Sequence, residues 1–286
     1  MNHLVKKAIF KADEIRMKLG LNMFQPVNVF TACEKIGLTV RFVDINMEGI
    51  YVTSRNSSFP TILISNLRPF PRRYFTCAHE LGHHVFGHGG KIDILTDNVD
   101  MMANREEDEL LVDAFAGAFL MPVAGILAEF VKRNWTIKNA TPLQFITISS
   151  VFGVGYQTLI SHCRLNRIIS DPHAQSLLNY KPNDILFKIF GGPVKNSFFK
   201  IIDDCAENPT IDLETSNYIF LPNDLKVEGN NLKQCQCTGA GIAYIAQRSG
   251  IVRVATKDGD EGSFIRIQNH GYIGLSENRH LENENE

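Results

Sequence analysis

The sequence predicts an α+β fold in three consecutive parts, over residues 1–125, 126–172 and 173–286. Three observations lead to this prediction. In the first part, apolar residues recur at helical spacing and are followed by short β-like runs, which indicates a small sheet laid on helices. The middle part contains two helix-compatible runs separated by a short turn that includes glycine. In the last part, strand-like pieces alternate with Gly, Pro and Asn, which is typical of a separate β-rich domain.

The first part is expected to start with an amphipathic helix over residues 3–18, where apolar side chains fall on one face. A second helix is predicted from about Pro26 to Gly37, because proline favours the first turn of a helix and glycine the position after its last. Three strands are then predicted at residues 38–43, 49–53 and 61–65.

Further helices are expected over residues 71–85, 104–121, 123–132, 142–151 and 156–168. The last two flank a turn at residues 152–155, and this arrangement resembles a helix-turn-helix. Thr141 and Pro142 provide an N-cap and a first helical residue for the earlier helix of this pair. Within the β-rich part, strands are predicted at residues 185–190, 218–221, 242–247, 251–255 and 263–267.

The overall charge excludes one broad class of function. With 29 Lys and Arg against 31 Asp and Glu, the formal net charge is −2, so bulk charge does not drive binding to nucleic acid. The N-terminus lacks the apolar run of a signal peptide, which predicts a cytoplasmic protein with reduced cysteines. Residues 114–128 are the most apolar stretch, but Pro122 interrupts it. We therefore expect a buried helix and no membrane association.

One short segment, from Cys77 to His84, contains the pattern H-E-x-x-H, with His79, Glu80 and His83 at its fixed positions. Residues four apart on a helix project in nearly one direction, so the two histidines can hold one Zn²⁺. Glu80 can then act as general base toward a zinc-activated water that attacks a carbonyl. The competing interpretation is a chance match on an ordinary helix. A helix-compatible run that follows a strand-like run favours the metal site.

Zinc hydrolases of this kind need a third protein ligand. The metzincin pattern is excluded, because Phe86 and Gly89 stand where it requires Gly and His. The next predicted helix offers Glu109 and Asp113, which are four residues apart and hence on one face. We expect Glu109 to ligate the zinc and Asp113 to orient a ligating histidine through its other ring nitrogen. Glu106 is the alternative ligand; it belongs to an acidic run that we expect to be a solvated helix start.

Together these segments resemble the ImmA/IrrE family of metallopeptidases. The family sequence H-E-L-G-H is present at residues 79–83, and Glu109 stands at the first glutamate of its second pattern, E-x-E-A-N-x-F-A-A-x-L-L-M-P. The end of that second pattern is matched by Phe115, Ala116, Leu120, Met121 and Pro122, whereas Leu111, Val112 and Asp113 replace its second Glu, its Ala and its Asn. The resemblance implies a zincin-like peptidase domain over residues 1–125.

The resemblance also implies a function. Members of this family are zinc-dependent endopeptidases that cleave a regulatory partner protein, commonly a helix-turn-helix repressor encoded nearby in mobile elements or stress-response systems. The C-terminal part would then sense a signal or hold the substrate. The alternative hypothesis is a non-proteolytic DNA-binding or stress-response regulator with a structural zinc. Three protein ligands beside a glutamate favour the enzyme, because structural sites are usually closed by four ligands.

Two further expectations concern the surroundings of the site. His84 and His88 are interpreted as the polar end of the helix, although His88 could instead contact substrate. The strand at residues 61–65 could lie at an edge of the sheet, where an extended substrate would pair with it. The alternative is a central strand, with Ile62 and Ile64 facing the core in either case.

DNA contact by the middle part is a separate hypothesis. The predicted helix over residues 156–168 carries His162, Arg164 and Arg167, which could reach DNA. Its apolar residues make a structural or protein-docking role at least equally plausible.

Overall fold

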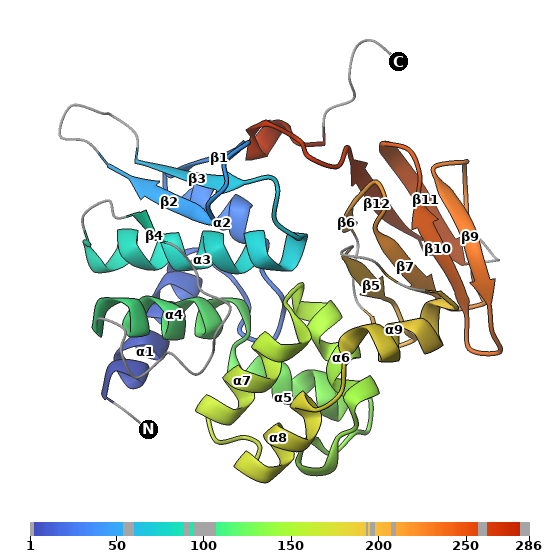
Figure 1. Cartoon of the computed structure of the whole chain (residues 1–286), viewed down its shortest axis with the longest axis horizontal. Helices are drawn as coiled ribbons and strands as arrows, with labels where there is room; N and C mark the ends of the chain where they lie inside the picture. The colour runs from blue at the N-terminus through green and yellow to red at the C-terminus, as the bar shows by residue number, and fades with distance from the viewer. Residues whose placement is uncertain are drawn as a thin grey trace.

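The computed structural model describes residues 3–53, 60–88, 92–93, 107–192, 194, 198–206, 210–256 and 262–280. Over these residues the chain has the predicted mixed α+β character (Figure 1). Helices and a mixed sheet make up the N-terminal part, further helices follow, and strands dominate after residue 198.

A five-stranded sheet has the order β13-β1-β3-β2-β4. Its strands are β1 (Thr39–Val43), β2 (Gly49–Val52), β3 (Thr61–Ser65), β4 (Ile92–Asp93) and β13 (Gly274–Leu275). The first three were predicted from the sequence. The pair β1–β3 is parallel, and the other neighbouring pairs are antiparallel.

The prediction that residues 61–65 form an edge strand is wrong. Strand β3 pairs with β1 along one side and with β2 along the other, so its ladder groups are used within the sheet. Ile62 and Ile64 are fully buried on one face of the sheet. Pairing of a substrate with β3 is therefore excluded.

Three helices are stacked beneath this sheet: α3 (Phe70–Phe86), α4 (Glu107–Leu120) and α1 (His3–Lys18). Figure 1 shows α3 directly under the sheet, α4 under α3, and α1 on the far side of α4. The short helix α2 (Val29–Lys35) precedes β1 and packs against α3. Helix α3 has proline in its first turn and ends at Gly87, whose φ of 72° closes the helix in the left-handed region.

The apolar stretch that continues through α4 into α5 (Val123–Lys132) lies inside the protein. By length and composition, residues 107–132 could cross a membrane, but 72% of the most apolar window is buried in the fold. Burial against the neighbouring helices accounts for its apolar character, in agreement with the expectation of a core helix.

The helical segment continues with α6 (Pro142–Phe152), α7 (Tyr156–Leu165), α8 (Asp171–Leu178) and α9 (Pro182–Phe190), and a 3₁₀ turn, η2 (Ile137–Asn139), precedes it. Helix α6 starts with a capping box between Thr141 and Gln144, as the predicted N-cap requires. Its axis and that of α7 differ by 97° across a turn of three residues.

The predicted strand at residues 185–190 is wrong, because these residues form the second half of α9. Pro182 occupies the first turn and Gly191, with φ of 70°, ends the helix. The buried residues Ile185, Leu186 and Phe190 have helical rather than alternating spacing. The short apolar run was ambiguous between helix and strand, and its flanking residues decided for a helix.

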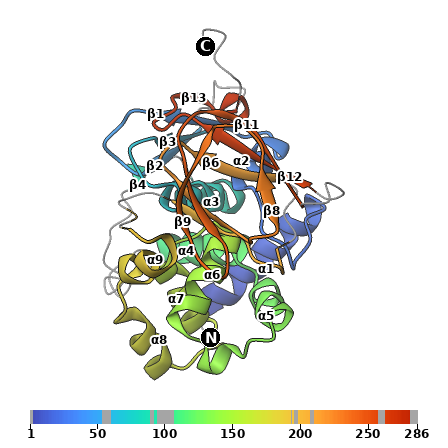
Figure 2. The ribbon, with the colours of Figure 1, turned by 90° about the vertical axis from the view of Figure 1, so that its right-hand side faces the viewer.

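The C-terminal part contains two four-stranded sheets, whose inner faces share a buried hydrophobic cluster (Figure 2). One sheet has the order β5 (Phe199–Ile201), β7 (Tyr218–Leu221), β10 (Ile242–Ala246), β9 (Leu232–Cys237). The other has the order β6 (Thr210–Glu214), β12 (Gly262–Gln268), β11 (Gly250–Thr256), β8 (Leu225–Val227). Four of the five predicted strands are present, as β7, β10, β11 and β12.

The last described residues return to the N-terminal sheet. Strand β13 extends its edge, with Leu275 opposite Arg41 and Gly274 opposite Phe42. The following 3₁₀ turn, η3 (Ser276–Asn278), packs on α2. The Arg279 guanidinium lies 5.4 Å from the centre of the Phe30 ring. Strands from the N-terminal and C-terminal parts of the chain thus belong to one sheet. The domain boundaries at residues 125 and 172 remain predictions.

Candidate metal centre

His79 and His83 lie one turn apart on α3 and project from the same face. Their Nε2 atoms are 3.3 Å apart, and both residues are almost completely buried. The sequence folds this way locally because the segment between them, with Leu81 in the core, continues the helix without interruption. Two imidazole nitrogens are thereby fixed side by side.

Gly82 lets the next helix approach. A Cβ atom at this position would lie 2.9 Å from the Cβ of Val112 and 3.2 Å from Cδ1 of Phe115, both on α4. Any larger residue would push α4 away from α3. The glycine therefore allows the two helices to come close enough for an acid on α4 to reach the histidines.

That acid is Glu109. Its Oε2 lies 3.3 Å from Nε2 of His79 and 3.7 Å from Nε2 of His83. Within the described residues, these three side chains form a group whose ligand atoms all lie within 4.8 Å of one another. Ligand bonds of about 2.0–2.2 Å in a tetrahedral zinc site place donor atoms roughly 3.3–3.6 Å apart, so the donor set and its spacing fit zinc.

Glu80 follows His79 directly and is 1% exposed. The backbone of β2 runs close to it: a Cβ atom on Gly49 would lie 3.7 Å from Oε1 of Glu80 and 2.5 Å from Cγ2 of Thr76. Strand β2 therefore lies directly beside this carboxylate, and a side chain at position 49 would crowd it.

Asp113 lies where the sequence analysis expected an orienting residue. Its Oδ1 is 2.8 Å from Nδ1 of His79, while Nε2 of the same ring faces Glu109. A carboxylate on Nδ1 keeps the proton on that nitrogen and leaves Nε2 with a free lone pair for a metal. The alternative ligand, Glu106, lies outside the described residues.

The two remaining histidines of this region have different partners. Nδ1 of His84 is 2.9 Å from the Tyr51 hydroxyl, and burial lowers the pKa of His84. Nδ1 of His88 is 3.1 Å from Nδ1 of His83. His88 is thus placed against a cluster residue rather than at a simple polar helix end. The only sequence signal for this contact is Gly87, which reverses the chain after the helix.

Comparison with known proteins identifies a family. The family model described as the IrrE N-terminal-like domain, Peptidase_M78, matches residues 33–163, which include α3, α4 and the whole cluster. Residues 33–163 of this chain match the Peptidase_M78 family. The M78 match spans the H-E-x-x-H helix and the acidic helix after it, and it supports a peptidase.

The other comparisons are less informative. A search of curated proteins finds no match. Among solved structures, a Mycobacterium tuberculosis transcriptional regulator is similar at 15% identity, over 54% of this chain and 45% of its own, with a TM-score of 0.32. The chain thus spans less than half the length of that protein.

Near the cluster, Cys77 has a structural environment. Its Sγ lies 3.7 Å from Sγ of Cys33, and both residues are fully buried. Burial raises the pKa of the Cys77 thiol. Among the described residues, the candidate ligands of the cluster offer nitrogen and oxygen donors.

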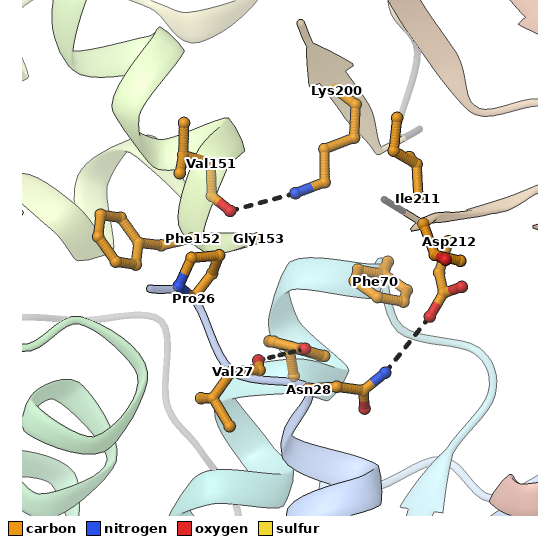
Figure 3. A pocket seen from close by; sticks show the side chains of 12 residues that line it. Pro26, Val27, Asn28, Phe70, Val151, Phe152, Gly153, Lys200, Ile211 and Asp212 are labelled. Carbon is orange, nitrogen blue, oxygen red and sulfur yellow. Dashed lines mark hydrogen bonds between the residues drawn. The ribbon is translucent and has the colours of Figure 1, made fainter. Parts of the chain in front are cut away.

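A separate cavity of about 180 Å³ lies where the segment before α2, helices α3 and α6, and strands β5 and β6 meet (Figure 3). Its polar groups are engaged by the protein: Nζ of Lys200 is 2.6 Å from the Ser150 carbonyl, and Asn28 donates to Asp212. Burial lowers the pKa of Lys200 to about 8. The cavity wall contains none of the three cluster residues, and it is lined by Pro26, Val27, Asn28, Phe70, Tyr74, Val151, Phe152, Gly153, Lys200, Thr210, Ile211 and Asp212.

Proposed function

We propose that this chain is a zinc-dependent endopeptidase that cleaves a regulatory partner protein. One observation carries the proposal: the donor atoms of His79, His83 and Glu109 have the mutual spacing of three ligands around one tetrahedral zinc. Membership of a peptidase family supports the same activity.

Each residue of the cluster has a distinct role in this proposal. His79, His83 and Glu109 hold the metal, and Asp113 keeps the His79 ring in position. A zinc ion bound there would polarise the scissile carbonyl and lower the pKa of water. Glu80 acts as general base: its carboxylate accepts the proton of the attacking water and delivers it to the leaving amine.

The substrate that we propose is a DNA-binding repressor, on the basis of the family resemblance. The reaction would take place in the cytoplasm, where the six cysteines, all free thiols here, stay reduced. A link to stress response rests on the same resemblance.

The parts of the chain would divide the work. Residues 1–125 form the zincin-like catalytic domain in this proposal, 126–172 the helix-turn-helix-like segment, and 173–286 a domain that senses a signal or binds substrate. Leu159, Ile160 and His162 are buried, which favours a structural or protein-docking role for α7 over DNA contact. The alternative, a non-proteolytic regulator with a structural zinc, is less well supported, because such sites usually have four protein ligands.

The test compares wild-type protein with Glu80→Gln in cells. Gln has nearly the shape of Glu but cannot accept a proton, so this variant should keep its zinc and lose cleavage by a factor of at least about 100. New protein N-termini are sequenced across the proteome after expression of either form. We expect termini within a DNA-binding repressor only with the wild type. The same set of new termini in both samples would exclude Glu80 as the base.

A further inference from the structure

Outside the three candidate ligands and Asp113, a second chain of polar contacts reaches the cluster. Nδ1 of His88 is 3.1 Å from Nδ1 of His83, and Nε2 of His88 is 3.4 Å from Oδ1 of Asp108. The sequence alone predicts only a polar helix end or a substrate contact for His88.

The backbone makes this placement specific. Gly87, with φ of 72°, turns the chain back at the end of α3, and the His88 N–H donates to the His83 carbonyl over 2.9 Å. The His88 ring then stacks on Phe86, with ring centres 5.9 Å apart, and its side chain is only 14% exposed. The imidazole is therefore held beside His83 by a turn and by an aromatic contact.

The hydrogen-bond chemistry of the three groups allows one consistent arrangement. If Nε2 of His83 faces the metal, its Nδ1 must carry the proton and donate it to a neighbour. The facing Nδ1 of His88 then accepts, which leaves the proton of neutral His88 on Nε2. That Nε2–H points to the Asp108 carboxylate, which can only accept.

We propose that His88 and Asp108 are positioning residues that fix the ring orientation and tautomer of His83 for metal binding. This inference rests on the proposed metal site. Under it, the two histidine ligands are oriented in different ways: Asp113 bonds His79 directly, whereas Asp108 acts on His83 through the imidazole of His88. Helix α4 then supplies one metal ligand, Glu109, and both orienting carboxylates.

The first experiment measures zinc affinity by competition with a chromophoric chelator. His88→Ala removes the acceptor for His83, and we expect affinity to fall by about 10- to 100-fold, the usual effect of losing such a partner. His88→Asn should restore most of the loss, because its amide oxygen can accept from Nδ1 of His83. His84→Ala is the matched control, because His84 is the neighbour of His83 on α3 but bonds Tyr51. This variant should retain wild-type zinc affinity.

The second experiment needs no variant at His88. Imidazole nitrogen NMR of the zinc-loaded wild-type protein should show His83 protonated on Nδ1 and His88 protonated on Nε2. Detection of His88 as the Nδ1–H tautomer overturns the proposal, as does wild-type zinc affinity in His88→Ala. Failure of the metal site itself would give a different result. Either the wild-type protein would bind no zinc, or His79→Ala would bind zinc as tightly as the wild type.

Discussion

At the scale of single residues, the site is built from polar side chains that the fold buries and pairs. His79, Glu80 and His83 are each at most 1% exposed, so water does not satisfy their polar atoms. Burial of such groups is costly unless partners are provided, and for the two histidines Asp113 and Glu109 provide them from a second helix. The same rule applies to His162, which is buried in α7 away from the cluster.

Zinc content is the most direct prediction at this scale. Purified protein reconstituted with zinc and freed of excess metal should contain about one zinc per chain by mass spectrometry. His79→Ala should lose nearly all of it, because one of three ligand atoms is gone. Equal zinc content in the two proteins would exclude this site.

The identity of the third ligand is a separate prediction. Glu109→Ala should weaken zinc affinity strongly, whereas Glu106→Ala should leave it close to wild type, because Oε2 of Glu109 lies within 4 Å of both histidine nitrogens. Chelator competition on both variants gives the ranking. The reverse ranking would show that the acidic helix is used one turn earlier.

His162 predicts how stability depends on pH. Burial lowers its pKa from 6.5 to about 4, and Nε2 lies 2.9 Å from the Met121 carbonyl, so the folded protein keeps the ring neutral. Between these two values the unfolded chain binds a proton that the folded chain does not. The free energy of unfolding must therefore fall on acidification, by about 1.4 kcal/mol per pH unit, or roughly 2 kcal/mol at pH 5.

Urea unfolding of wild type and His162→Asn at pH 7 and pH 5 measures this effect. His162→Asn is expected to lose that part of the pH dependence. Its free energy of unfolding at pH 7 will also fall, because Gly117 packs closely on the His162 ring, which the variant lacks. An identical difference between the two pH values in both proteins would show that His162 is not responsible.

At the scale of elements, the close contact of α3 and α4 makes the cluster possible. The ligands come from two helices, so their distances depend on how near the helix axes lie. Gly82 occupies the contact point, between the two histidines of α3 and opposite Val112 of α4. A small residue at this point is therefore a requirement of the site as well as of packing.

Gly82→Ala is predicted to weaken zinc binding about tenfold, because the added methyl group would separate the helices and move Glu109. Overpacking of this kind costs about 1–3 kcal/mol of stability, which more than offsets the better helix propensity of alanine. Chelator competition and thermal unfolding report the two effects.

Two further variants serve as controls for Gly82→Ala. Gly239→Ala adds the same methyl group where no atom lies within 4 Å, and it should leave zinc affinity unchanged. Adding Val112→Ala to Gly82→Ala removes one of the atoms in conflict, Cγ1 of Val112, and should recover part of the affinity. Unchanged zinc binding in Gly82→Ala alone would contradict the role assigned to this contact.

At the scale of the whole molecule, a buried ion pair connects helix α3 with the C-terminal strands. Arg73, on α3, forms a 2.6 Å ion pair with Glu214 of β6, and both side chains are at most 2% exposed. Gln268 of β12 also donates to Glu214. These contacts join the C-terminal strands to the helix that carries His79, and they support the proposed sensing role.

Breaking this pair should be costly. Glu214→Gln leaves the Arg73 guanidinium buried without its carboxylate, and we expect the free energy of unfolding to fall by about 3–5 kcal/mol. The double change Arg73→Met with Glu214→Gln removes the uncompensated charge and should recover most of the loss. Urea denaturation of the four proteins tests the coupling, and additive losses would refute it.

Local patterns in the sequence were sufficient to predict many of the helices and strands and most of the candidate site residues. On a helix, the H-E-x-x-H spacing places the two histidines on one face, whatever surrounds it. Proline and glycine at the ends of α3 mark its limits through backbone geometry alone. The acidic helix, with Glu109 and Asp113 four residues apart, follows from the same periodicity. The mixed α+β character was also predictable, and the family comparison confirms the predicted ImmA/IrrE resemblance.

Contacts between distant residues decided the rest. No local signal distinguishes a central strand from an edge strand, so the position of β3 depended on β1 and β2. The pairing of β13 with β1 joins residues more than 200 positions apart, which local periodicity does not encode. The contact of His88 with His83 arises because a turn and a second helix converge there. The sequence determines which side chains can bind a metal, because that depends on residue type and helical spacing. Tertiary packing decides which partners orient those side chains, because the partners come from distant segments.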